Sequence, residues 1–202
     1  ERAPRPGREV VARAGRPKPV SPHALGAIAV LIGLGWSLRT TLVGGPPLHW
    51  LVAPLALFVL GPRWAAVAVV GGAAFAAAVE TMPWAELPVA VLVDGWLPIA
   101  VAWGWLKLVE RRLPAHLFVY LFVAVFAGTL LAALAGGAVE RLLHDLGSVR
   151  AAAPEWWVAL LILADGEAVT TGFVVTGLAV FRPDWIQTFD PDRYLRRPGP
   201  RD

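Results

Sequence analysis

The chain has 202 residues, a net charge of +3, 57 % hydrophobic residues and only 16 % charged residues. A soluble domain carries about 25 % charged residues, and at this size it buries only about 70 % of its surface. The composition therefore excludes a disordered chain, and the lack of cysteine excludes a disulfide scaffold and thiol chemistry. We expect an integral membrane protein that contacts the lipid bilayer.

The first 22 residues predict a basic, proline-rich arm. They contain six Arg and Lys residues against Glu1 and Glu9, and four prolines that prevent a continuous helix. We interpret this charge as a topology signal of an extended cytoplasmic arm (1–22), and we expect no nucleic-acid partner. Because the sequence begins with Glu1 and not with Met, we expect a chain that is processed, trimmed or incomplete at its start.

Six apolar segments follow within 23–181, the predicted transmembrane domain. They cover 23–38, 48–60, 64–79, 88–109, 117–143 and 156–181. Continuous runs of Ala, Leu and Gly favour helices over the alternating strands of a barrel. We predict an all-α bundle of about six transmembrane helices. The shorter segments, such as the one that ends at Gly61-Pro62-Arg63, must be bent, shielded or partly re-entrant.

The positions of Lys and Arg predict the orientation. With six spans and a cytoplasmic N-terminus, most of them fall on the inner side, and only Arg39, Arg141 and Arg150 fall outside. We therefore expect both termini in the cytoplasm. The tail (182–202) mixes aromatic and charged residues, and we expect it to lie along the inner membrane surface.

Small residues recur every four positions in the last two segments. This spacing lets membrane helices approach closely, so it predicts packing faces or a face for a partner helix. The residues concerned are Gly128, Ala132 and Gly136, and then Ala168, Gly172 and Thr176.

Few ionisable residues lie within the apolar segments, where each costs about 2.5–3.5 kcal/mol and is a functional candidate. Asp94 is followed by Gly95 and Pro98, which favour a broken helix; a cavity-facing carboxylate and a hydrogen-bonded packing role both remain open. Asp165 and Glu167 are about 200° apart on a helix, so at most one faces a given cavity. Glu167 precedes a small, Thr-bearing face that suits the bundle interior.

His49 follows Pro46-Pro47 at the outer start of a short segment. It is either a hydrogen-bonded interfacial residue or a metal ligand. The sequence has no Walker loop, no G-x-S-x-G and no H-E-x-x-H, so we do not expect an enzyme. Transport by this chain would need an ion gradient or the ATPase of a partner.

Several strings resemble a known family. PPLHWLVAPLALFVLGPRWAAVAVV resembles the H-L-L-G…L-G-P-W region of the CbiM-like permeases, the substrate-capture membrane components of energy-coupling-factor importers for cobalt and nickel. DGEAVTTGFVVTGLAVFRPDW resembles the last span of that family. ERRLPAHLFVYLFVAVFAG and DWIQTFDPDRYL are similar to a proteobacterial branch of energy-coupling-factor permease-like membrane proteins. The likeness covers about residues 34–195.

The resemblance implies a bundle of six or seven spans in a bacterial inner membrane. It also implies a metal held by the N-terminal amine, a His in the second position and the His of the H-L-L-G string. Only the last carries over, as His49, because Glu1-Arg2 stands at the start and Trp50-Leu51-Val52 follows the His. We thus expect no certain cofactor and a divalent metal ion as substrate, at an incomplete site. The candidate ligands are His49, Asp94 and Glu167.

Two functions remain open. The chain is either an importer component that works with a coupling membrane protein and cytoplasmic ATPases, or a non-transporting accessory subunit of a larger membrane complex. Convergence of His49 with Asp94 or Glu167 around a cavity favours the importer. Scattered ionisable residues favour the accessory subunit, which reuses the permease fold for packing.

Overall fold

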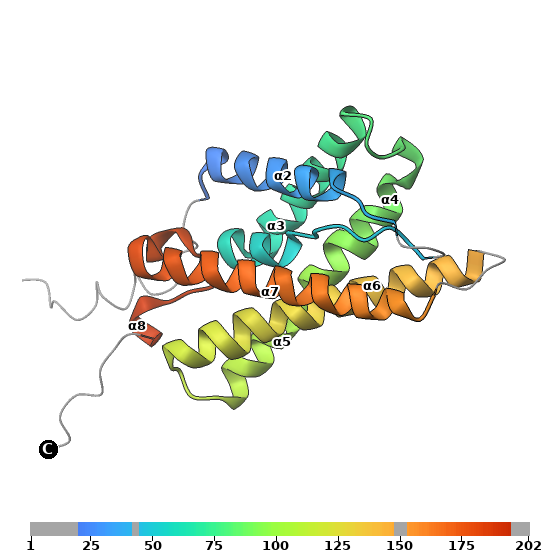
Figure 1. Ribbon diagram of the computed structural model, residues 1–202. Coiled ribbons are helices and arrows are strands. Elements are labelled where there is room, and N and C mark those ends of the chain that lie inside the picture. Colours follow the sequence, from blue (N-terminus) through green and yellow to red (C-terminus); the bar gives the residue numbers. More distant parts are fainter. Residues whose placement is uncertain (1–19, 42–44, 148–152, 195–202) are drawn as a thin grey trace, which may run out of the picture.

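The computed structural model describes residues 20–41, 45–147 and 153–194. The regular structure of these residues is helical, apart from an isolated bridge between Thr40 and Leu48 (Figure 1). Four helices are long and apolar enough to cross a membrane: Ala53–Ala78, Trp84–Arg112, Val119–Gly147 and Glu155–Phe181. Helix α2 (Pro22–Ser37) is a shorter apolar helix. The predicted all-α membrane bundle is confirmed.

Helix α3 (Ala53–Ala78) combines two of the predicted segments. Gly61 has φ 77° and ψ 166°, which breaks the helix into stretches 53–60 and 62–78. All residues of the first stretch are buried. With about 1.5 Å of rise per residue it extends only about 12 Å, too short to cross about 30 Å of hydrocarbon. The surrounding protein shields this stretch from lipid, as its length requires. With the extended residues before it, the stretch leads from the bridge at Thr40 and Leu48 to the break at Gly61, which lies beside Gln187 of the tail.

The second long helix changes its winding near Asp94. It contains η1 (Trp84–Glu86), α4 (Leu87–Ala90), the π-helical η2 (Val91–Trp96) and α5 (Leu97–Arg112). Pro98 has no N–H for the carbonyl of Asp94, which removes one α-helical bond at this point. A Cβ on Gly95 would overlap the side chain of Val69, so glycine lets η2 lie directly against α3.

The third long helix begins with the π-helical η3 (Val119–Phe126) and continues as α6 (Ala127–Gly147). The predicted packing residues Gly128, Ala132 and Gly136 are all buried in α6. A Cβ on Gly128 would lie 3.0 Å from the Trp105 ring of α5. Helices α5 and α6 therefore approach each other closely at these small residues.

The small residues predicted on α7 (Glu155–Phe181) lie in different surroundings. Ala168 is buried, Gly172 is half-buried and Thr176 is exposed. The hydroxyl of Thr176 donates to the carbonyl of Gly172 at 2.7 Å, within its own helix. The buried face of α7 instead includes Leu160, Ala164, Ala168 and Val175.

The tail supplies hydrogen bonds to the break in α3. Pro62 has no N–H to offer the carbonyl of Phe58. The hydroxyl of Thr188 donates to that carbonyl at 2.9 Å, and the N–H of Gln187 donates to the carbonyl of Val59 at 3.1 Å. Segment 182–194 thereby satisfies backbone groups inside the bundle.

The same segment packs its apolar side chains on the bundle. Ile186 and Phe189 are buried, and Thr188 also hydrogen-bonds the Tyr120 hydroxyl at 2.8 Å. The segment contains η4 (Pro183–Trp185) and α8 (Pro191–Tyr194), and Trp185 is exposed. Most of the predicted arm (1–22) lies outside the described residues.

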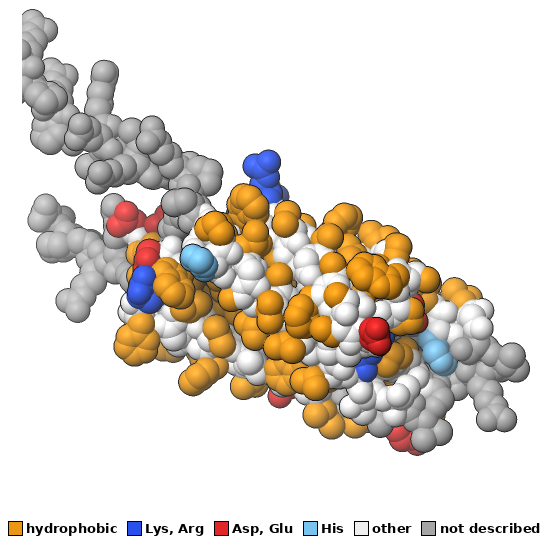
Figure 2. All heavy atoms as spheres, turned by 90° about the horizontal axis from the view of Figure 1, so that it is seen from above, with side chains coloured by type: hydrophobic (Ala, Val, Ile, Leu, Met, Phe, Trp, Pro, Cys, Tyr) orange, Lys and Arg blue, Asp and Glu red, His pale blue; other side chains and the backbone are white. Residues whose placement is uncertain are grey.

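The start of α2 and the end of α7 lie at the same end of the bundle (Figure 1). Hydrophobic side chains are spread widely over the face seen in Figure 2, and Lys, Arg, Asp and Glu are few on it. A surface of this kind fits a lipid environment.

Candidate metal centre

The segment before α3 enters the bundle without regular structure. Thr40 and Leu48 exchange two backbone hydrogen bonds of 2.8 Å, which close the loop between α2 and α3. Leu48, His49 and Leu51 are buried, and Val52 adopts a left-handed conformation with φ 56°. Irregular backbone buried in a membrane protein must find its hydrogen-bond partners within the protein.

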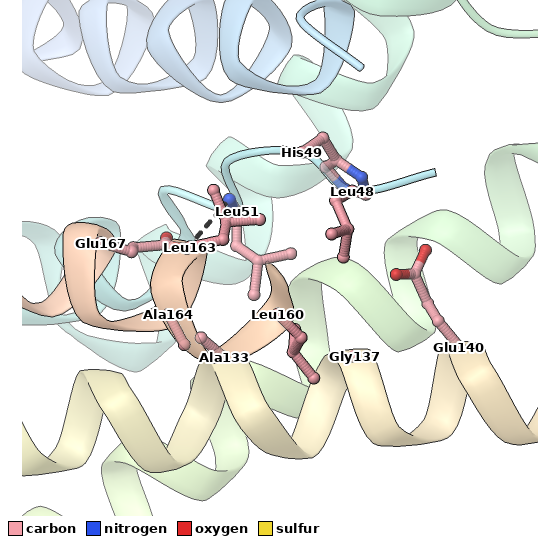
Figure 3. A pocket seen from close by; sticks show the side chains of 10 residues that line it. All are labelled: Leu48, His49, Leu51, Ala133, Gly137, Glu140, Leu160, Leu163, Ala164 and Glu167. Atoms are coloured by element: carbon pink, nitrogen blue, oxygen red, sulfur yellow. Dashed lines mark hydrogen bonds between the residues drawn. The ribbon is translucent and has the colours of Figure 1, made fainter. Parts of the chain in front are cut away.

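Side chains from two helices supply these partners. The Glu167 carboxylate of α7 accepts the N–H of Val52 at 2.6 Å. It also accepts the N–H of Leu51 at 3.2 Å (Figure 3). The indole N–H of Trp36 donates to the carbonyl of Leu51 at 3.2 Å. The indole of Trp156 donates to the carbonyl of Pro46 at 2.9 Å. These four bonds hold the segment that carries His49.

His49 lies on this segment, outside the four long helices. Its ring packs against Trp36 in a T-shaped pair with the ring centroids 5.9 Å apart. The neutral imidazole is the form that binds a metal ion.

Two carboxyl groups meet His49 from separate helices. His49 Nε2 lies 3.6 Å from Asp94 Oδ2, which projects from η2. Glu140 of α6 completes a group in which one ligand atom from each residue lies within 4.8 Å of the others. His49 and Asp94 are buried and Glu140 is partly buried. Two carboxylates this close repel each other unless a proton or a cation lies with them.

The polar atoms of this group fit a bound cation. Neither ring nitrogen of His49, nor Asp94 Oδ1, has a hydrogen-bond partner among the described residues. An unsatisfied buried group costs about 1–3 kcal/mol, and a metal ion would satisfy it. Bonds of about 2.1 Å place two ligands of one ion about 3 Å apart, so the observed spacings need only a modest contraction. One imidazole and two carboxylates suit divalent first-row metals.

A small cavity lies beside the group. It has a volume of about 10 Å³, close to the space of one water molecule. Figure 3 shows Glu140 and Glu167 on opposite sides of the lining, with leucines between them.

The structure brings together two of the three predicted ligands. His49 and Asp94 are neighbours, whereas Glu167 engages the backbone of Leu51 and Val52. Glu167 is thus placed to position the His49 segment. Asp165, two residues earlier, is exposed on α7, in keeping with their expected separation around the helix.

Glu140 was not among the predicted ligands, although it lies in the predicted segment 117–143, near the end of that segment. Helix α6 carries it and continues to Gly147. The small residues Gly128, Ala132 and Gly136 are spaced by four, and the next step of four reaches Glu140. Extending the stripe by one position identifies this carboxylate as a residue of the same helix face.

A comparison with protein families matches residues 11–185 to CbiM, described as the cobalt uptake substrate-specific transmembrane region. Comparisons with curated proteins and with solved structures give no match. The matched range includes His49, Asp94 and Glu140, and the four long helices. The chain therefore belongs to the CbiM family of membrane components for cobalt uptake.

Proposed function

We propose that this protein is the substrate-capture membrane subunit of an energy-coupling-factor importer for a divalent cation of the cobalt and nickel class. The observation that carries the proposal is the convergence of His49, Asp94 and Glu140 from a loop and two helices. The cation is the substrate of the protein and not a resident cofactor.

The chemistry of the three ligands supports capture of such an ion. Two carboxylates balance the charge of a divalent cation, so a loaded site carries no net charge into the low-dielectric bundle. The imidazole of His49 favours transition metals over Mg²⁺ and Ca²⁺, which prefer oxygen ligands. Glu167 holds the backbone two residues beyond His49 and thereby fixes the position of the ring.

We place the protein in a bacterial inner membrane, with both termini in the cytoplasm. The distribution of Lys and Arg in the sequence supports this orientation. The start of α2 and the end of α7 lie at one end of the bundle, which fits two termini on the same side of the membrane.

Further membrane subunits complete the importer, and α7 is the face we assign to them. Ile162, Val169 and Phe173 on this helix are 68 %, 53 % and 81 % exposed. Asp165 lies among them, about 12 Å along the helix from Trp157, and makes no hydrogen bond or ion pair with another described residue. A carboxyl group that faces lipid at this depth costs about 2.5–3.5 kcal/mol, which a partner helix with a hydrogen-bond donor would offset.

Metal titration of the purified full-length protein tests the site. We expect wild type to bind about one Co²⁺ per chain. Asp94→Asn and Glu140→Gln should each weaken binding at least about 100-fold, because loss of a direct ligand exceeds the 10–100-fold effect of outer-shell changes. Asp165→Asn is the matched control and should bind like wild type. Equal binding by all four proteins would contradict the site.

Purification of the tagged protein from its own host, with mass spectrometry, tests the importer. Recovery of ATPase subunits and a coupling membrane protein is the expected result, and Asp165→Leu should reduce it. Recovery of an unrelated membrane complex without ATPases would overturn the importer and establish the accessory subunit instead.

A further inference from the structure

A groove of about 770 Å³ opens beside the break in α3. Its walls are the first turns after Gly61, the second half of α5, and Gln187 and Thr188 of the tail. The volume is within the range of about 300–1,000 Å³ that is usual for small-ligand sites. None of its lining residues belongs to the His49, Asp94 and Glu140 group.

The polar part of the groove has a positive balance. Arg63 is exposed and makes no hydrogen bond or ion pair with another described residue. Lys107 Nζ lies 2.7 Å from Glu110 and 4.2 Å from the centre of the Trp103 ring. Arg193 also approaches Glu110, at 3.6 Å, so the one carboxylate is shared by two cations. Three cations, Arg63, Lys107 and Arg193, thus face the single carboxylate of Glu110. The remaining positive charge can bind an anion.

The remaining wall is apolar and faces outward. Trp64 and Val67 are 47 % and 51 % exposed, and they follow Arg63 along α3. Tryptophan is enriched at membrane interfaces, where an apolar ring meets a polar headgroup layer. On α3, the cation Arg63 is thus followed directly by the apolar surface of Trp64 and Val67.

We propose that this groove binds an anionic phospholipid. The phosphate of the headgroup lies between Arg63 and Lys107, and an acyl chain follows Trp64 and Val67. Basic pockets between membrane helices are suited to such headgroups. The zwitterionic headgroup of phosphatidylcholine has a cation of its own, which this positive rim disfavours.

The terminal segments of the chain do not have the charge to occupy the groove. Residues 1–22 contain six basic and two acidic residues, and residues 195–202 contain three Arg and one Asp. Both segments are net positive, so the rim repels them. An anionic ligand from outside the chain is complementary to it.

Native mass spectrometry of the delipidated full-length protein tests the proposal, with phosphatidylglycerol and phosphatidylcholine added separately. We expect wild type to retain phosphatidylglycerol in preference to phosphatidylcholine. Arg63→Gln and Lys107→Gln should each weaken retention roughly fivefold. Arg112→Gln changes an exposed cation at the end of α5 that does not line the groove, and it should leave retention unchanged.

Three results would overturn the proposal. One is equal retention of the two lipids by wild type. Another is equal loss of phosphatidylglycerol in Arg63→Gln and Arg112→Gln, which would indicate general surface attraction. The third is displacement of the lipid by millimolar inorganic phosphate or by an acidic peptide, which would assign the groove to a free anion or to a protein partner. Thermal unfolding without lipid controls for the folding of each variant.

Discussion

Glu167 is the residue whose role departs furthest from the expected one, and Glu167→Gln tests the role that the structure gives it. The carboxylate accepts two backbone N–H groups, one on each oxygen, from Val52 and Leu51. Glutamine has the same length but only one acceptor oxygen, since its amide nitrogen is a donor. The variant therefore keeps one of the two bonds and turns a donor toward the other N–H.

The size of the effect follows from burial. Glu167 is 2 % exposed, so no water replaces the lost acceptor. A buried N–H without a partner costs about 1–3 kcal/mol. If this cost falls on the bound arrangement of the His49 segment, it weakens metal affinity by about 5- to 150-fold. The three ligands themselves are unchanged.

Co²⁺ titration and thermal unfolding of the purified protein measure the two consequences. We expect Glu167→Gln to bind one Co²⁺ per chain with reduced affinity and to unfold at a lower temperature. Glu140→Gln should lose affinity much more than it loses stability. Asp165→Asn, on the opposite face of α7, is the control for removal of a carboxylate charge. Unchanged affinity together with unchanged unfolding in Glu167→Gln would refute a positioning role.

Two further predictions concern packing and the tail. Thr188→Val removes the hydroxyl that bonds Phe58 and Tyr120 and should lower stability by about 1–3 kcal/mol, whereas Thr176→Val, on an exposed face, should change it by less than about 0.5 kcal/mol. Both are measured by unfolding in detergent, and equal effects would contradict the proposed tail contact. Gly95→Ala should destabilise the protein by about 1–3 kcal/mol because its Cβ meets Val69, while Gly104→Ala, with open space around it, should be neutral or stabilising. Similar unfolding temperatures for the two alanine variants would show that η2 does not need its close approach to α3.

The sequence was sufficient for the membrane class and for most helix positions, because apolar runs and their breaks carry that information directly. It separated segments 48–60 and 64–79 at Gly61-Pro62, where the structure has its break. It did not show that the first of these begins as extended chain. That conformation depends on hydrogen bonds from Trp36, Trp156 and Glu167, which are distant in sequence and leave no local pattern.

The candidate site was predictable only in part for a related reason. His49 and Asp94 are conspicuous because each interrupts an apolar run. Glu140 lies near the polar end of the predicted segment 117–143, and its approach to His49 and Asp94 depends on how α6 packs against other elements. Glu167 was conspicuous because a carboxylate inside the membrane is unfavourable in free energy. Hydrogen bonds from two backbone N–H groups offset this free energy as a bound cation would, so the sequence did not distinguish the two roles.

The hydrogen bonds between the tail and the break in α3 have a consequence for biosynthesis. Thr188 and Phe58 are 130 residues apart, so the first helical stretches enter the membrane well before their last partner has been made. At about 5–20 residues per second the ribosome needs roughly ten seconds to cover that distance. During this interval the carbonyl of Phe58 lacks the hydroxyl of Thr188 as its hydrogen-bond donor. The tail supplies this donor only after helix α3, one of the first helices, has been inserted. A protein cut before Gln187 would therefore retain every long helix and still lack the contact that closes the bundle.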